Sequence, residues 1–440
     1  GETPSAVMSG FTVHGAGHRC IAIEESSPTL SDLIISSCGD HVTLGTSTSE
    51  FGGMLVDAGS PTLDQLTFTD NRGELGAAIR LRNDSSVVIS NSSFSGGVAT
   101  HGGAIHITDG DLLLETLTFS ENTAIFGHGG ALYATGADLE VMDIEVTNGT
   151  ATYNGGALAL TDGTAWLQDI ILTANLATYG DGGGLYISGT TIVNLSGVVA
   201  SDNVSGGHGG AASIHLTDTS LSISGITAER NNATSSGGAL QLVGGRYYIN
   251  DATLIDNSTD GTGGAVVLPG PGALQMQFRQ VEGNQAGADG GGLALGEADT
   301  PLSNVVVNTT LFADNRAGEH GGGARIYASS LNSSECHWRF NQSISGSGGA
   351  LSWAGTTAIL DANQVLGNSA WNGGGFYLDM GSDLALSASV FQENTGANTA
   401  GGALISGSGT AQILNNDFLG NQSLRATGVG NLATLAVIRS

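Results

Sequence analysis

One phrase recurs along most of the chain at a nearly fixed spacing, and this repeat limits the folds open to it. Two or three small residues, mostly glycine, precede an aliphatic residue. Further aliphatic residues then fall at alternate positions, as in Ile105 and Ile107, which is the period of a β-strand. Copies lie about 27 residues apart and begin at Gly52, Gly76, Gly102, Gly129, Gly155, Gly182, Gly209, Gly237, Gly263, Gly290, Gly321, Gly348, Gly373 and Gly401.

A second phrase keeps the same spacing. An apolar residue, two variable residues and an asparagine precede each glycine group, as in Phe119 to Asn122 and Phe391 to Asn394. A unit of short strands and Gly, Asn, Asp or Ser turns cannot bury a core alone, so it must stack on its neighbours. The sequence therefore predicts an all-β protein, a single-stranded parallel β-helix (β-solenoid) of about fifteen coils whose equivalent positions lie about 4.8 Å apart.

Stacking predicts columns of equivalent residues along the helix. Asparagine suits a corner column, because its amide donates and accepts along the stack and its backbone tolerates the left-handed region. The inner aliphatic column is expected at Leu55, Ile79, Ile105, Leu132, Leu158, Leu185, Ala212, Leu240, Val266, Leu293, Ala324, Leu351, Phe376 and Leu404. The asparagine ladder is expected at Asn71, Asn122, Asn175, Asn203, Asn231, Asn257, Asn284, Asn315, Asn341, Asn368, Asn394 and Asn421.

The repeat also suggests how the chain is organised. Residues 1–51 read as less regular coils, and residues 52–440 as regular repeats of one continuous solenoid domain. Strand-like stretches lie near both ends, at Ser9 to Val13 and Leu435 to Ile438. We expect either a segment of a longer protein or subunits that associate head to tail.

The two phrases together resemble the repeat of the polymorphic outer membrane proteins. The pattern F-x-x-N followed by G-G-A and Ile, Leu or Val appears as Phe119 to Asn122 with Gly129 to Leu132. The resemblance covers about Gly52 to Leu432 and implies a right-handed β-helix. It also implies a non-catalytic, surface-exposed role of the kind that family's autotransporter passengers have in adhesion. Unlike the family, this sequence shows no C-terminal membrane-barrel segment.

Composition excludes several classes of partner. The chain has 40 acidic residues against 12 basic ones, all arginine, and a net charge of −28. It would repel a phosphate backbone, so no nucleic-acid partner is expected. Aromatic residues are only 5% of the chain, which predicts an aliphatic core. No apolar stretch approaches the roughly 20 residues of a membrane-spanning helix, so no transmembrane segment is expected.

The alternative function is a polysaccharide-binding or polysaccharide-cleaving β-helix of the lyase or hydrolase kind. A hydrolase needs two facing carboxylates, and a lyase needs a base with a cation to stabilise the intermediate. Acidic residues do recur before the asparagine ladder, but Asp202, Arg230 and Asp256 there are better explained as compensating surface charges. The other members are Asp70, Glu121, Asp314 and Glu393.

Turn residues before the glycines offer two further candidates. A column of His101, His128, Asn154, Asp181 and His208, with His320 further along, could bind a metal, but backbone-bonding turn residues explain it as well. The metal site is left unknown. No cofactor is expected, and calcium on the acidic loops is the one candidate, without a location. The turn aromatics could stack sugars or pack on each other, and they are Phe126, Tyr153, Tyr179 and Trp371.

Cysteines and glycosylation sequons complete the candidate sites. Cys20 and Cys38 could form a disulfide, and Cys336 is expected to be buried and inert. Four sequons fall in the asparagine ladder, at Asn203, Asn257, Asn341 and Asn421, and should stay unmodified. The free glycosylation candidates are Asn83, Asn91, Asn148, Asn194, Asn232, Asn308 and Asn332.

These observations favour a non-enzymatic structural protein. We expect an extracellular or cell-surface β-helical rod that acts as a filament subunit or an adhesive stalk. Its partners would be further copies of itself, joined head to tail, or a surface carbohydrate or host receptor. Glycosylation of the free sequons is part of the same hypothesis.

Overall fold

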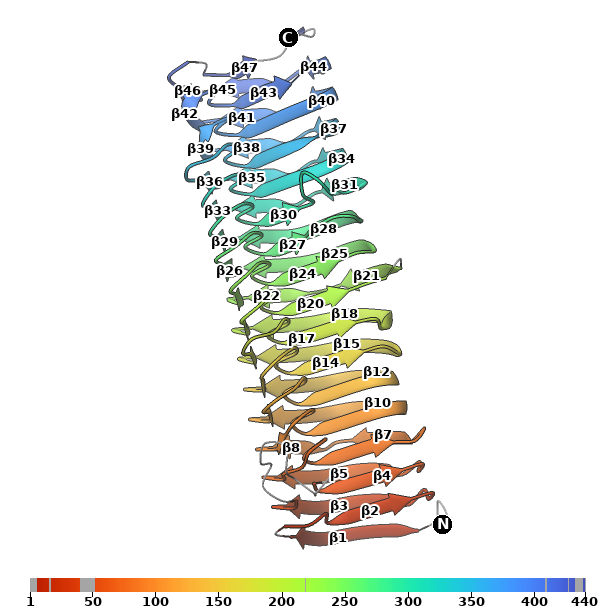
Figure 1. Ribbon diagram of the computed structural model, residues 1–440. Helices are drawn as coiled ribbons and strands as arrows, with labels where there is room; N and C mark the ends of the chain where they lie inside the picture. Colours follow the sequence, from red (N-terminus) through yellow and green to blue (C-terminus); the bar gives the residue numbers. More distant parts are fainter. Residues whose placement is uncertain are drawn as a thin grey trace. The chain divides into compact units, whose positions relative to one another are not determined.

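The protein is built from β-strands throughout the part that the structure describes. A computed structural model describes residues 6–15, 17–39, 52–217, 219–407, 410–425, 427–431 and 438–439. These residues contain no helix, and therefore none long and apolar enough to cross a membrane. The chain divides into two compact units, Gly1–Ile214 and His215–Ser440, and within each unit the strands stack in parallel (Figure 1).

In the first unit, the coils from β6 onward contain longer strands followed by a strand of two residues. The coil of β10 (Ile105–Ser120) and the coil of β12 (Leu132–Thr147) pair in parallel register from Ile105 with Leu132 to Ser120 with Thr147. The remaining strands are β1 (Val7–His14), β2 (Ile21–Glu24), β3 (Thr29–Ser36), β4 (Met54–Asp57), β5 (Thr62–Thr69), β6 (Ile79–Arg82), β7 (Ser86–Ser90), β8 (Ser93–Ser95), β9 (Val98–Ala99), β11 (Thr123–Ala124), β13 (Thr150–Ala151), β14 (Leu158–Thr161), β15 (Thr164–Thr173), β16 (Leu176–Ala177), β17 (Leu185–Ser188), β18 (Thr191–Ser201) and β19 (Val204–Ser205), with β20 (Ala212–His215) at the unit boundary.

The second unit repeats the same coil. Parallel pairing joins Ala324 with Leu351 and Leu351 with Phe376 in successive coils. Its strands are β21 (Ser220–Ser224), β22 (Thr227–Glu229), β23 (Asn232–Ala233), β24 (Leu240–Val243), β25 (Arg246–Ile255), β26 (Ser258–Thr259), β27 (Val266–Leu268), β28 (Ala273–Glu282), β29 (Gln285–Ala286), β30 (Leu293–Leu295), β31 (Asn304–Asn308), β32 (Leu311–Ala313), β33 (Arg316–Ala317), β34 (Ala324–Ser334), β35 (His337–Arg339), β36 (Gln342–Ser343), β37 (Leu351–Asp361), β38 (Gln364–Leu366), β39 (Ser369–Asn372), β40 (Phe376–Ser387), β41 (Val390–Gln392), β42 (Thr395–Thr399), β43 (Ala403–Gly407), β44 (Thr410–Leu414), β45 (Asp417–Leu419), β46 (Gln422–Ser423), β47 (Val429–Asn431) and β48 (Ile438–Arg439).

The fold class predicted from the repeat is confirmed: all described elements are strands, and their pairing from coil to coil is parallel. The short-strand face occurs thirteen times in the described residues, from β9 to β46, somewhat fewer than the about fifteen coils expected. The first coils add long strands without a described short strand. The predicted boundary between residues 51 and 52 lies at the edge of residues 40–51, which are outside the described residues. The predicted C-terminal strand includes Leu435 to Val437, which are also outside them.

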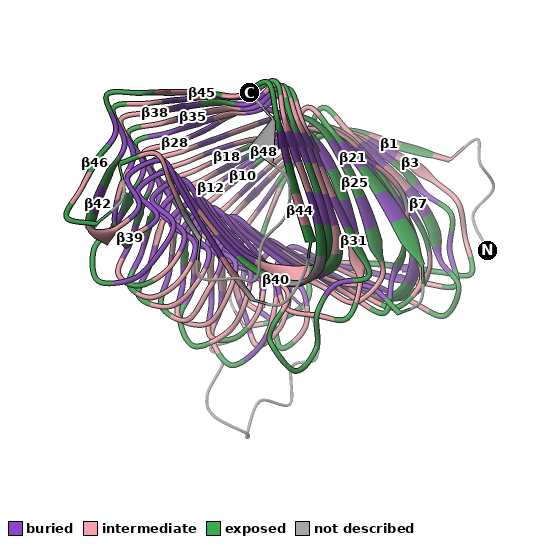
Figure 2. Cartoon of the chain, turned by 90° about the horizontal axis from the view of Figure 1, so that it is seen from above, coloured by how far each residue is buried: buried purple, intermediate pink, exposed green. Residues whose placement is uncertain are grey.

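The core of each unit is aliphatic, with aromatic rings stacked between coils. Buried and more exposed residues alternate along the strands (Figure 2). In the first unit, Phe68, Phe94 and Phe119 stack with ring centroids 5.0 and 4.8 Å apart. In the second, Phe391 and Phe418 lie 4.8 Å apart and nearly parallel. The apolar residue of the F-x-x-N phrase therefore fills the interior, next to the corner that the asparagine occupies.

The inner column is shifted by one residue from the prediction in two coils. Met54, not Leu55, pairs with Ile79, and Ala403, not Leu404, pairs with Phe376. The reason in the later coil is that Ala400, with φ 49°, occupies the left-handed position that glycine fills in other coils. The phrase there starts one residue earlier than Gly401, so counting from the glycine pair gave the wrong register.

The asparagines form a hydrogen-bonded ladder that is continuous along the second unit. Asn341 Oδ1 accepts from the Asn315 backbone N at 3.1 Å and from Asn315 Nδ2 at 2.9 Å. Its own Nδ2 donates to the Phe312 carbonyl O and to Asn368 Oδ1, both at 2.9 Å. Each carboxamide thus satisfies the backbone of the preceding coil. The buried ladder residues of this unit are Asn231, Asn257, Asn284, Asn315, Asn341, Asn368, Asn394 and Asn421.

The ladder of the first unit is interrupted by smaller residues. Asn122 Oδ1 accepts from the Gly97 backbone N at 3.0 Å, and Nδ2 donates to the Phe94 carbonyl O at 3.0 Å. Asn175 Nδ2 donates to Asn203 Oδ1 at 2.9 Å, so the hydrogen bonds between asparagine side chains resume at these two residues. The remaining member, Asn71, is also buried. Where glycine stands at the corner, its backbone N–H still needs an acceptor. The asparagine of the following coil supplies it with its side-chain oxygen, as Asn122 does for Gly97.

We expect Asn341→Ala to lower the free energy of unfolding by about 2–4 kcal/mol, because it removes four hydrogen bonds and leaves the Asn315 backbone N–H buried without an acceptor. Chemical denaturation followed by circular dichroism measures the change. Asn332→Ala is the matched control, since Asn332 lies half-buried on the outer face and its loss should cost within about 0.5 kcal/mol. Equal effects of the two variants would contradict a stabilising role of the ladder.

Candidate functional site

One outward-facing column in each unit is buried or half-buried although its side chains point away from the core. We call it the covered column: it holds the residue that follows the inner aliphatic one on each strand. In the first unit, Arg80 of β6 pairs with His106 of β10, which pairs with Tyr133 of β12. His106 is only 4% exposed. The second unit places Ala294, Arg325, Ser352 and Tyr377 in the equivalent column.

The turn before each strand folds back over the covered column. Gly102 in this turn has φ +58°, and a Cβ there would lie 2.1 Å from the Ile105 carbonyl O, so only glycine allows the approach. The turn brings the His101 ring to 6.5 Å from the His106 ring and 5.3 Å from the Tyr133 ring, measured between centroids. The recurrent glycines therefore explain why polar outward residues become buried.

In the first unit, this packing produces a cluster of histidine and tyrosine rings. His106 and Tyr133 lie 5.3 Å apart, and His128 lies 5.6 Å from His101. Burial, aided by the positive charge of Arg80, lowers the pKa of His106 to about 3. Burial also lowers the pKa of His101, with a contribution from His128. These imidazoles are therefore neutral at physiological pH, because the imidazolium form would be poorly solvated.

The predicted turn column is an acceptor ladder for the backbone of the next coil. His101 Nδ1 accepts from the His128 backbone N at 3.4 Å, and His128 Nδ1 accepts from the Asn154 backbone N at 3.2 Å. Asn154 and Asp181 continue with their side-chain oxygens, at 2.9 Å to the Asp181 N and 2.8 Å to the His208 N. Imidazole, carboxamide and carboxylate are interchangeable here, because each supplies one acceptor.

The second unit uses the same turn arrangement. Asp289 Oδ1 accepts from the His320 backbone N at 2.8 Å, and His320 Nδ1 accepts from the Ser347 backbone N at 3.0 Å. Backbone bonding therefore accounts for His101, His128 and His320, whereas His208 Nδ1 is buried without a hydrogen-bond partner among the described residues. Across the described ranges, no group of three or more His, Cys, Asp or Glu side chains is arranged to hold a metal ion.

The charged residues before the asparagine ladder share a backbone conformation. Asp70, Glu121 and Asp256 have φ of 53°, 55° and 52°, in the left-handed region, and Asp202, Arg230, Asp314 and Glu393 have φ between 53° and 58° as well. Asp and Asn reach this region more readily than most residues. Arg230 bonds the neighbouring Glu229 at 3.1 Å on the surface. The column thus has a local backbone explanation.

An open groove in the first unit was not predicted from the sequence. It has a volume of ≈ 590 Å³ and lies across β7, β10, β12 and β15. Trp166, 42% exposed, borders it together with Asp111, Asp138 and Glu140. Glu140 and Trp166 are neighbours in the strand register. An exposed indole beside carboxylate acceptors suits a ligand with both an apolar face and hydroxyl groups.

The turn aromatics selected from the sequence lie on the surface. Tyr179 is 75% and Trp371 53% exposed, whereas Phe126 is 38% exposed. Tyr153 packs against His128 with centroids 5.8 Å apart, so it belongs to the histidine cluster. Trp166 was not identified from the sequence because it lies within a strand. The alternation of apolar and polar residues predicts that its side chain points outward, but it does not predict a groove beside it.

The sequons differ in accessibility. The ladder asparagines Asn203, Asn257, Asn341 and Asn421 are buried. The other seven are exposed or half-buried: Asn83, Asn91, Asn148, Asn194, Asn232, Asn308 and Asn332. Several of these amides are already engaged, since Asn83 Nδ2 donates to Asp57 and Asn91 Nδ2 to Asp64.

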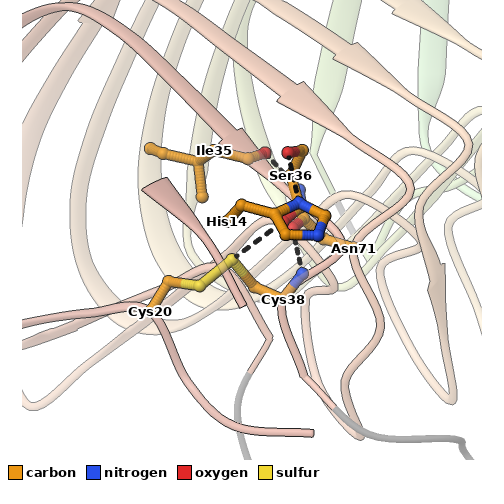
Figure 3. Close-up of a disulfide and its surroundings, with 6 residues drawn as sticks. All are labelled: His14, Cys20, Ile35, Ser36, Cys38 and Asn71. Carbon is orange, nitrogen blue, oxygen red and sulfur yellow. Dashed lines mark hydrogen bonds between the residues drawn. A yellow bond between two sulfur atoms is a disulfide. The ribbon is translucent and has the colours of Figure 1, made fainter. Parts of the chain in front are cut away.

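Cys38 and Cys336 each donate their backbone N–H to an asparagine Oδ1 of the next coil. Cys20 and Cys38 form a disulfide, and the Cys38 backbone N donates to Asn71 Oδ1 at 3.0 Å (Figure 3). Cys38 thus stands one coil before the first ladder asparagine. Cys336 is a buried free thiol, and burial raises its pKa to about 11. A thiol that stays protonated is a poor nucleophile.

Acid should destabilise the first unit through the histidine acceptors. The folded pKa values of His101 and His128 lie below the ordinary value near 6.5, so their contribution is complete above pH 6.5 and is lost as pH falls through the folded values. Protonation at Nδ1 would remove the acceptor for the next coil. We expect the thermal midpoint to fall between pH 7 and pH 5.

The matched variant replaces both histidines with asparagine, the residue at this position in the next coil. In His101→Asn/His128→Asn, the carboxamide can accept as Asn154 does, but it cannot titrate. The variant should show a smaller fall of the thermal midpoint over the same pH range. His106 remains and contributes acid sensitivity of its own, so the slope should shrink without vanishing. An unchanged slope would contradict the assignment.

Comparison with known proteins agrees with this architecture. A family model described as a right-handed β-helix region matches residues 2–143 and 77–260, which together span more than half of the chain. No curated protein matches the chain. The parallel pairing of successive coils agrees with the family match. The chain therefore belongs to the right-handed parallel β-helix family.

Proposed function

We propose that the protein is a non-catalytic structural component of the cell surface or extracellular space, in which the β-helix acts as a filament subunit or an adhesive stalk. The right-handed β-helix occurs both in polysaccharide lyases and hydrolases and in non-enzymes, so the proposal depends on how this chain uses its polar residues. The polymorphic outer membrane type of repeat, suggested by the paired F-x-x-N and G-G-A phrases, is part of the proposal.

The observation that carries the proposal is that the repeated polar residues hold one coil to the next. Asn341 bonds the coils on both sides, and His128 and Asn154 accept from backbone N–H groups. Such residues are constrained by stacking and cannot also be free to take part in a reaction. Repeated coils provide a long surface and identical edges, which suits display and self-association.

Electron microscopy and analytical ultracentrifugation of the full chain test this role. We expect concentration-dependent association into end-to-end particles, because a parallel strand with an unpaired edge can pair with a further strand. A strictly monomeric protein with turnover of polysaccharide would contradict it.

Glycosylation of the exposed sequons, such as Asn83 and Asn148, belongs to the same proposal. The intact mass of the native protein measures it, and a mass equal to that of the bare chain would contradict glycosylation.

The groove beside Trp166 supports a second candidate, polysaccharide binding. Its indole is exposed next to Asp138 and Glu140, so a sugar ring could stack there while its hydroxyl groups donate to the carboxylates. We expect Trp166→Ala to weaken binding of neutral oligosaccharides about tenfold, the factor for about 1.4 kcal/mol. Affinity electrophoresis in polysaccharide gels measures it.

The control for the groove is Trp371→Ala, which removes an indole of similar exposure from a turn of the second unit. It should leave the affinity unchanged. Equal retardation of the wild type and both variants would contradict binding in the groove. Release of shorter oligosaccharides during the same incubation would favour cleavage over binding.

A further inference from the structure

Arg325 in the second unit is a buried cation without a carboxylate partner. The residue is 9% exposed and lies on β34, in the covered column. Its Nη1 donates to Ser352 Oγ at 2.7 Å, and its Nη2 donates to the Tyr327 hydroxyl. Both partners are neutral, and Nε has no hydrogen-bond acceptor. Within the described residues, Arg325 takes part in no ion pair.

A buried charge of this kind is costly unless something compensates it. An isolated cation removed from water loses favourable solvation free energy, and buried arginines are usually paired with an anion. The guanidinium lies over the Tyr327 ring with its carbon 4.1 Å from the centroid, which offsets only part of this loss. The charge therefore remains available to an anion from outside the chain.

The same guanidinium borders a pocket. The pocket has a volume of ≈ 150 Å³ and is lined by Arg325, Tyr327, Asp289, Glu297 and Val267, among others. One wall is thus cationic and aromatic, and two side chains of the lining carry carboxylates. Asp289 already uses Oδ1 to accept from the His320 backbone N, whereas Glu297 is exposed. All of these residues belong to the second unit.

We propose that this pocket binds the carboxylate of a hydroxylated acid, a sugar acid either free or as part of a glycan. A planar guanidinium matches a carboxylate, and one positive charge balances one negative charge. A doubly charged phosphate would be repelled by Asp289 and Glu297. Those two carboxylates instead accept hydroxyl donors, and the Tyr327 ring offers a surface to the ligand's carbon skeleton.

The proposal is independent of the structural role and of the groove beside Trp166, which lies in the other unit. Its failure would leave filament formation untouched, and a monomeric protein could still bind the acid. It differs from the groove in ligand charge as well: the pocket requires an anion, whereas the groove is bordered by Asp111, Asp138 and Glu140 and should disfavour one.

Isothermal titration calorimetry of the full chain with sodium glucuronate, glucose and inorganic phosphate tests the site at low ionic strength. We expect saturable binding of glucuronate and none of glucose or phosphate. Arg325→Gln should weaken glucuronate binding at least about tenfold, the factor for one lost charge-assisted hydrogen bond. Arg325→Lys keeps the charge but loses the planar fork, so its affinity should fall between those of the wild type and Arg325→Gln.

Arg246→Gln is the matched control, because Arg246 is an exposed arginine of the same unit and should not affect binding. Arg325→Gln should also raise the thermal midpoint of the ligand-free protein, since it removes an uncompensated buried charge. The proposal would be overturned if glucuronate did not bind, or if it bound to the wild type and to Arg325→Gln with the same affinity. A glucuronate oligomer that binds at least tenfold tighter than the monomer would assign the site to a glycan, and equal affinities would assign it to the free acid.

Discussion

The structure depends on satisfying the corner of every coil with a hydrogen bond from the next one. Parallel strands pair their backbones along the faces of each coil, but at a turn the N–H groups lose this partner. The asparagine carboxamide fills the gap, as Asn341 does for the backbone of Asn315. Because the bond reaches the neighbouring coil, the spacing between corners is fixed, and strands, rings and turns elsewhere in the coil inherit it.

A second ladder does the same work at the glycine turn with different side chains. His128, Asn154 and Asp181 each provide one acceptor to the following coil. The identity of the residue matters less than the position of its lone pair. This explains why a column that resembles a set of metal ligands contains a carboxamide, and why its imidazoles are held neutral by burial.

Functional capacity therefore resides where stacking does not determine the side chain. One such place is the outer strand face, where Trp166 borders an acidic groove. Another is the covered column, where the turn buries whatever residue stands on the strand. His106 and Arg325 are both found there, and neither is required by the repeat, since alanine occupies the same column at Ala159 and Ala294.

The sequence by itself determined the fold class and its period, because both phrases recur in phase and an isolated unit could not bury its apolar face. It did not determine the register at Leu404, since Ala400 can adopt the backbone conformation that glycine adopts elsewhere. Only the tertiary structure decided which outward residues are covered. Alternation along a strand says that Arg325 points away from the core, but its burial and its neighbours come from a turn and from other coils.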